Sequence, residues 1–153
     1  MSVISGDAYW AHVITPNTKY NTEGEWTIEV CNLDEVNKGI AEADGLKVKS
    51  DADHPEKGDF VTLKQYARTK EGVFRPMNVK DSQKNPFPTN ERIGNGSKVK
   101  ASYYPRPYEQ FGGGVKGYLQ GVQVLDLIPY NVDDLMWLRV DMYQKRMPPN
   151  YRR

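Results

Sequence analysis

Alternation of apolar and polar residues dominates this chain and predicts mostly β-strands. In residues 25–32, for example, Trp26, Ile28 and Val30 fall on one face and polar residues fall on the other. The same period of two predicts strands at residues 8–15, 46–50, 60–68, 97–104 and 115–128, with a short strand around 77–79. The apolar positions are rich in Val, Ile, Trp and Tyr, which favour strands. The pattern therefore predicts a fold that is mainly β.

Helical spacing is found in two places. In residues 33–43 the apolar residues recur every three or four positions, acidic residues occupy the first turn, and Gly45 follows the last turn, so a short helix is expected there. Residues 133–147 carry a stripe of leucine and methionine that ends before Pro148, which predicts a C-terminal helix. That helix either packs on its own barrel or docks a partner.

Turn and loop signals separate these segments. Residues 70–92 form a proline-containing excursion, Gly112 to Gly114 form a hairpin tip, and Pro105 and Pro107 are expected to end the strand after Tyr104. Short strands with one internal helix predict an OB-fold-type antiparallel five-stranded barrel. We expect this barrel in residues 1–130, followed by the C-terminal helix and a basic tail in residues 131–153.

Composition removes several classes of protein. No apolar run approaches the roughly 20 residues that cross a bilayer, so we expect no membrane segment and no signal peptide. Cys31 is the single cysteine and only two histidines, His12 and His54, are present, so we expect no disulfide, no metal site and no cofactor. We expect a structural thiol at Cys31, a solvated turn around His54, and no enzymatic activity.

The near-neutral total charge conceals an uneven distribution. Residues 1–58 contain 5 basic and 11 acidic side chains, whereas residues 59–153 contain 16 basic and 9 acidic ones. This asymmetry fits an anion-binding face opposite an acidic face, and it equally fits two halves that pair with each other. Charge alone therefore identifies no partner.

The richest candidate site is residues 92–118, which hold five basic residues and five aromatic ones. Strand alternation places Lys98, Lys100 and Tyr104 on one face, and Arg106 and Lys116 extend the same basic segment. Cations that follow phosphates and rings that stack on unpaired bases suit a single-stranded nucleic acid. The alternative is an ordinary solvated sheet face.

A second strand repeats this pattern. Lys64, Tyr66 and Arg68 fall on one face of the segment 60–68, while Val61, Leu63 and Ala67 fall on the face that suits a core. If the two basic strands are neighbours in one sheet, they form a stacking platform for a nucleic-acid strand. Lys47 and Lys49 also share a face, although acidic residues nearby weaken that signal.

Several strings in this sequence occur together in a known family. The opening SGDAYWAHVITPNTKYNTEGEWTIEV, the central GLKVKSD and GDFVTLKQYA, the turn IGNGSKVKASYYP and the closing GVKGYLQGVQVLDLIPY occur in this order. With them, the chain resembles the single-stranded-DNA-binding proteins of tailed bacteriophages, the group related to the replication ssDNA-binding protein of the T-odd phages. The resemblance covers residues 5–130.

The resemblance implies an OB-fold that coats single-stranded DNA without sequence preference in phage replication, recombination or repair, in the cytoplasm of the infected bacterial host. It also implies replication or recombination enzymes as partners and allows a homodimer. The DNA-facing elements would contain Trp10, the turn with Lys19 and Tyr20, the strand with Lys64, Tyr66 and Arg68, and the strand with Lys98, Lys100 and Tyr104. Trp10 and Trp26 could each be core instead, and we favour the core for Trp26.

The C-terminus departs from the family pattern. Many members end in an acidic tail that recruits replication enzymes, whereas residues 144–153 of this chain are basic. The alternative function is therefore a phage protein-interaction module that uses its C-terminal helix and does not bind DNA.

Overall fold

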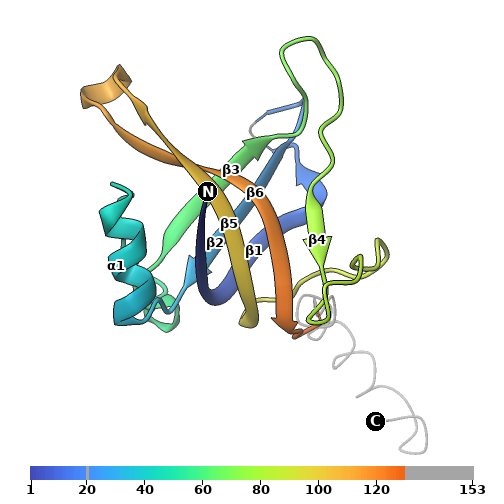
Figure 1. The fold of residues 1–153 in the computed structure, drawn as a ribbon, viewed down its shortest axis with the longest axis horizontal. Helices are drawn as coiled ribbons and strands as arrows, with labels where there is room; N and C mark the ends of the chain where they lie inside the picture. The colour runs from blue at the N-terminus through green and yellow to red at the C-terminus, as the bar shows by residue number, and fades with distance from the viewer. Residues whose placement is uncertain (20, 130–153) are drawn as a thin grey trace, which may run out of the picture.

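The computed structural model describes residues 1–19 and 21–129, and in this part of the chain six strands form one sheet (Figure 1). The strands are β1 (Ser2–Asn17), β2 (Glu25–Cys31), β3 (Val61–Tyr66), β4 (Asn78–Lys80), β5 (Ser97–Tyr108) and β6 (Gly114–Asp126). Their order is β3-β2-β1-β5-β6-β4, and a parallel pairing of β3 with β6 closes five of them into a barrel. The predicted OB-fold-type, mainly β architecture is confirmed.

The barrel core comes from the alternation that the sequence displays. Trp26, Ile28 and Val30 of β2 are buried, and so are Val61 and Leu63 of β3, while their polar neighbours face outward. The indole N–H of Trp26 donates to the carbonyl oxygen of Arg75 at 2.7 Å, which satisfies its one polar atom in the core. The predicted core position of Trp26 is therefore confirmed.

Closure of the barrel depends on a close approach between β3 and β6. Leu63 pairs with Gly117, and a Cβ atom at Gly117 would lie 2.5 Å from Cδ2 of Leu63. Only a residue without a side chain fits here, because the core is already filled by Leu63 and Tyr103. Gly117 thus allows the two strands to meet.

The internal helix α1 (Glu35–Ala43) is confirmed, with a start two residues later than predicted. Asp34 is its N-cap and accepts a hydrogen bond from the backbone N–H of Asn37 at 2.9 Å. Hydrogen bonds from Asn37 lower the pKa of the Asp34 carboxyl. The side chain of Asn37 in turn accepts from the backbone N–H of Ser5 at 2.8 Å, so the helix is joined to β1.

Two predicted strand boundaries are wrong. Strand β5 continues through Pro105 and Pro107 to Tyr108, because β1 pairs with β5 only as far as Tyr103. Beyond that point β5 has a free edge, where a proline removes no ladder hydrogen bond. Strand β1 begins at Ser2 instead of Ala8, because Ser2 to Ala8 pair with β5.

The predicted strand 46–50 is also wrong in extent. It is reduced to a single bridge between Lys49 and Phe60, because residues 51–58 leave the sheet and form the 3-10 turn η1 (Pro55–Lys57). The short strand expected near residue 78 is present as β4, which adds to the outer edge of β6.

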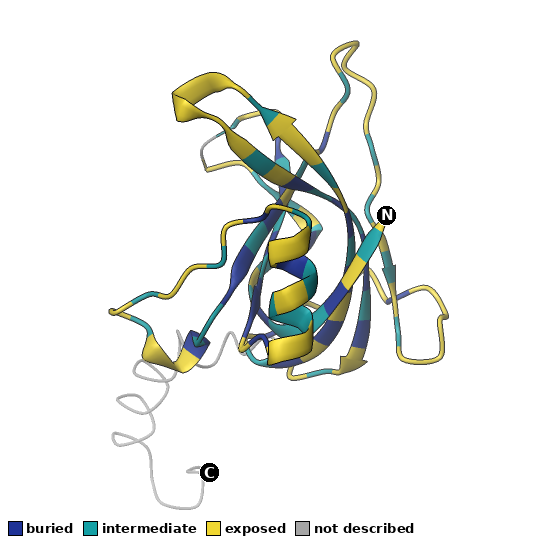
Figure 2. Cartoon of the chain, turned by 60° about the vertical axis from the view of Figure 1, so that its left-hand side comes forward, coloured by how far each residue is buried: buried dark blue, intermediate teal, exposed yellow. Residues whose placement is uncertain are grey.

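The hairpin of β5 and β6 projects beyond the barrel (Figure 1), and its outer part is largely exposed (Figure 2). A second 3-10 turn, η2 (Gln110–Gly112), forms its tip.

The predicted C-terminal helix at 133–147 and the segment 131–153 lie outside the described residues. Among the described residues, no helix is long and apolar enough to cross a membrane, and no group of three or more potential ligand side chains could hold a metal ion.

Candidate nucleic-acid interface

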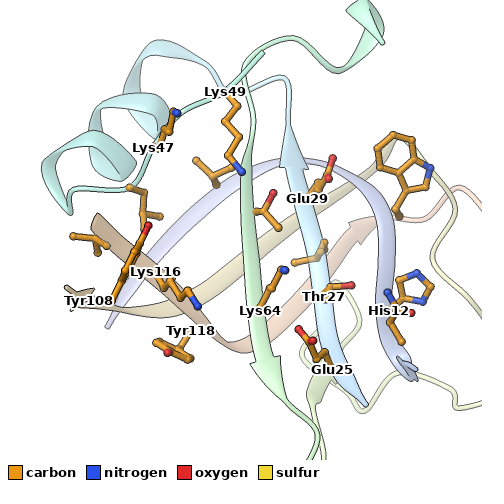
Figure 3. Close-up of a pocket in the computed structure, with 18 residues that line it drawn as sticks. His12, Glu25, Thr27, Glu29, Lys47, Lys49, Lys64, Tyr108, Lys116 and Tyr118 are labelled. Carbon is orange, nitrogen blue, oxygen red and sulfur yellow. The ribbon is translucent and has the colours of Figure 1, made fainter. Parts of the chain in front are cut away.

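A groove of about 790 Å³ crosses the outer face of β2 and β3 (Figure 3). The β5–β6 hairpin and the segment that follows α1 bound it on one side, and β1 bounds it on the other. Its chemically distinctive side chains are basic, aromatic or acidic: Trp10, His12, Glu25, Glu29, Lys47, Lys49, Lys64, Tyr108, Lys116 and Tyr118. We call this feature the β2–β3 groove.

Strand register produces the mixture of charges and rings around the groove. Five register partners on successive strands form a row around the barrel: His12, Thr27, Lys64, Tyr118 and Tyr104. Paired residues in adjacent strands project to the same side of a sheet. The row therefore carries one cation between two tyrosines and a histidine.

Four lysines supply positive charge to the groove. Lys64 comes from β3, Lys116 from β6, and Lys47 and Lys49 from the segment between α1 and β3. All four are exposed, and none has an ion-pair partner among the described residues. The Lys116 ammonium lies 5.5 Å from the centre of the Tyr108 ring. These charges are available to an anionic ligand that enters the groove.

Trp10 stands at the rim of the groove in an unusual backbone conformation. Its φ is +48°, at a register irregularity between Tyr9 and His12, and its backbone N–H donates to Oδ1 of Asn95 at 2.8 Å. The indole is 43% exposed, although His54 packs edge-on against it at a centroid distance of 5.1 Å. Strained residues at bulges commonly re-aim a side chain toward a binding site.

Lys57 is 1% exposed and packs against the ring of Trp10. Its ammonium lies 4.3 Å from the Trp10 ring centre and 3.7 Å from that of Phe60. It forms an ion pair with Glu29 at 2.5 Å and lies 3.8 Å from Asp51. This cation therefore ties the loop 51–58 to β2 and to the ring at the groove rim. His54, expected in a solvated turn, keeps 43% side-chain exposure and also packs against the Trp10 ring.

The predicted site residues that the structure describes lie in several separate regions. Lys64, Lys116 and Trp10 line the groove, and Tyr104 and Arg106 lie opposite groove residues Tyr118 and Lys116 on the hairpin. Tyr66 is 48% exposed at the end of β3, next to Glu25 of β2. Tyr20 lies outside the described residues.

Lys98 and Lys100 lie elsewhere, on the outer face of β5 beside β1. Lys98 is six residues from Tyr104, which corresponds to about 20 Å along a strand. Its ammonium bonds Asp7 at 2.7 Å, and this hydrogen bond raises the pKa of Lys98. The two basic strands of the sequence prediction are not neighbours, because β6 lies between β3 and β5.

Arg68 and Lys19 also fall outside the groove. Arg68 donates to the carbonyl oxygen of Gly72 at 2.9 Å and stacks near Phe74. Lys19 lines a second hollow of about 370 Å³, together with Arg92. His12 lines both hollows, so they adjoin. Partial desolvation, and then the charge of Arg92, lower the pKa of His12.

Sequence reasoning missed several groove residues. Tyr108 and Tyr118 could have been found by folding the hairpin about Gly112 to Gly114, because that register brings Tyr118 opposite Tyr104. Lys47 and Lys49 carried a signal that nearby acidic residues obscured. Lys57 had no signal, because nothing in a polar loop distinguishes a buried lysine from a solvated one.

Cys31 is buried as expected, and burial raises its pKa to about 12.

No protein-family model matches the chain, and no curated protein matches it in sequence. Solved structures do share its fold. One is gp2.5, a single-stranded DNA binding protein encoded by bacteriophage T7, at a TM-score of 0.61 and 20% identity, over 88% of this chain and 97% of that one. Another is the single-stranded DNA-binding protein from bacteriophage Enc34 in complex with ssDNA, at a TM-score of 0.61 and 16% identity, over 84% and 89% of the two chains.

Proposed function

We propose that this protein binds single-stranded DNA in the β2–β3 groove, without catalysis and without requiring a defined sequence. The observation that carries the proposal is a set of four exposed lysines, without ion-pair partners among the described residues, beside the rings of Trp10, Tyr108 and Tyr118 in one groove of the barrel. The β2–β3 face and the adjoining loops are where OB-folds bind oligonucleotides. The shared fold with two phage ssDNA-binding proteins supports the same ligand.

In this proposal the lysines neutralise phosphates while Trp10, Tyr108 and Tyr118 offer stacking surfaces to unpaired bases. Each stacked base contributes roughly 1–3 kcal/mol. The biological role is to coat phage DNA in replication, recombination or repair within the infected bacterial host. Replication or recombination enzymes, and a second copy of the chain, are the partners we propose for that role.

A fluorescence-anisotropy titration tests the ligand. A labelled ~30-nucleotide oligo(dT) spans at least one site, since OB-folds cover roughly 4–16 nucleotides. We expect tight binding to this strand and much weaker binding to the duplex of equal length. The logarithm of the affinity should fall against the logarithm of the salt concentration with a slope of about 0.7 per phosphate neutralised. Absence of binding at low salt would refute the proposal.

A further inference from the structure

The β2–β3 groove is chemically asymmetric across its width. Lys47, Lys49 and Lys116 lie on the side of α1 and the hairpin, and His12 lies on the β1 side (Figure 3). Between them, β3 presents Lys64, and β2 presents Thr27 and two carboxylates. A bound strand that places its phosphates toward the lysines therefore directs its bases toward β1 and β2.

The two carboxylates of β2 differ in what they contact. Glu29 forms its ion pair with the buried Lys57 and is engaged in the fold. Glu25 has no hydrogen-bond or ion-pair partner for its side chain among the described residues, and it lines the groove. A carboxylate left unpaired in a groove for a polyanion opposes phosphate, so its favourable ligand is a hydrogen-bond donor.

The neighbours of Glu25 suit it to contact a base. Register places Tyr66 directly across β2–β3 from Glu25 and Asn17 across β1–β2. Side chains in such pairs have Cβ atoms about 4.5–5.5 Å apart. A base stacked on the half-exposed ring of Tyr66 would therefore have its edge within hydrogen-bond reach of the carboxylate.

We propose that Glu25 ranks the bases of the bound strand by accepting hydrogen bonds from their edges. This inference rests on the proposed function and adds a base preference to it. Guanine presents two adjacent N–H donors to a carboxylate, and cytosine presents one amino group. Thymine presents a single N–H between two carbonyl oxygens, which repel the second carboxylate oxygen. The expected order is guanine first, then cytosine, then thymine.

Anisotropy titrations with three labelled ~30-nucleotide strands test the ranking: oligo(dT), alternating d(TC) and alternating d(TG). The wild-type protein should bind d(TG) about tenfold more tightly than oligo(dT), which lies within the discrimination of a bidentate contact. In Glu25→Gln this ratio should fall to about one, because an amide donates to one thymine oxygen while accepting from its N–H. Oligo(dT) should also bind the variant more tightly than wild type.

Glu71→Gln is the matched control, because it removes the same charge from an exposed turn outside both hollows. It should keep the wild-type ratio, and melting temperatures should show that both variants fold. Equal wild-type affinity for all three strands would overturn the inference and leave the proposed function standing. A preference that persists in Glu25→Gln would also overturn it. Failure to bind any strand would overturn both proposals.

Discussion

Two outer faces of the barrel carry alternating lysines, and they differ in what surrounds each charge. On the groove face, Lys64 lies in a row with Tyr118 and Tyr104, and no described residue forms an ion pair with it. On the β1–β5 face, Lys98 is paired with Asp7, and Lys100 lies between Ser5 and Gln123. Similar strand patterns thus leave Lys64 without an ion pair among the described residues, whereas they give Lys98 an acidic partner in Asp7.

Charge reversal should separate these two faces most strongly. Lys64→Glu with Lys116→Glu should weaken ssDNA binding at least about hundredfold, since hydrogen bonds to charged groups contribute about 1.5–3 kcal/mol each. The matched control is Lys80→Glu with Lys100→Glu, which changes the same charge at exposed positions on either side of Gln123. Anisotropy at fixed salt measures both. If the control weakens binding as much as the groove variant, the distinction between the faces is wrong.

Lys57→Met tests whether a buried charge supports the groove rim. Loss of one partner of a buried pair is strongly destabilising, but Glu29 keeps 22% side-chain exposure, so we expect a loss of about 2–3 kcal/mol in the free energy of unfolding. Urea unfolding measures it. Adding Glu29→Gln should recover part of the loss, because only the more exposed carboxylate of Asp51 then lacks its cation. Unchanged stability in Lys57→Met would contradict the ion-pair role.

Trp10→Ala tests the ring at that rim. We expect a loss of about 1–3 kcal/mol in binding free energy, which is the contribution of one stacked base, with little change in melting temperature because the indole is 43% exposed. Phe111→Ala is the control, since Phe111 is a fully exposed ring at the hairpin tip outside both hollows. A large fall in melting temperature with unaltered DNA binding would assign Trp10 to the fold instead.

The smallest expected effect is a pH dependence from His12. The pKa of His12 is lowered in the folded chain, whereas in the unfolded chain it has its ordinary value of about 6.5. Below that pH, the unfolded chain therefore binds more protons than the folded chain. Stability should therefore fall as the pH drops through that value toward the folded-state pKa. His12→Gln should remove this component when melting temperatures are compared across pH 5 to 8. If His12→Gln shows the same dependence of melting temperature on pH as the wild type, the assignment of this dependence to His12 is wrong.

The strand and helix pattern was predictable because each element is amphipathic by itself. The alternation in β2 identified Trp26, Ile28 and Val30 as core residues from local spacing alone. The helix signals that begin at Asp34 predicted the position of α1, also from local sequence. The extension of β5 through Pro105 was not predictable, because it depends on where β1 stops pairing. Local propensity describes a proline in isolation, whereas its tolerance depends on a free strand edge.

The candidate site divides in the same way. Lys64 and Lys116, predicted as DNA-binding residues from charge and alternation, line the groove, whereas Lys98 and Lys100 met the same criteria and lie farther along β5, outside the groove lining. Their role in binding DNA stays a prediction. The resemblance to phage ssDNA-binding proteins pointed to the fold that the structure has. Neither source could identify Lys57, whose burial requires contacts from β2, Phe60 and Trp10 at once.

The sequence by itself determined the mainly β architecture, the inward face of each strand and a surplus of basic and aromatic residues after residue 59, because these are properties of neighbours along the chain. Only the tertiary structure decided which of those residues meet. The parallel pairing of β3 with β6 brings Lys64 beside Tyr118, and the register of β1 and β5 gives Lys98 an acidic partner. Whether a lysine is available to a ligand depends on which residue is paired with it on the neighbouring strand.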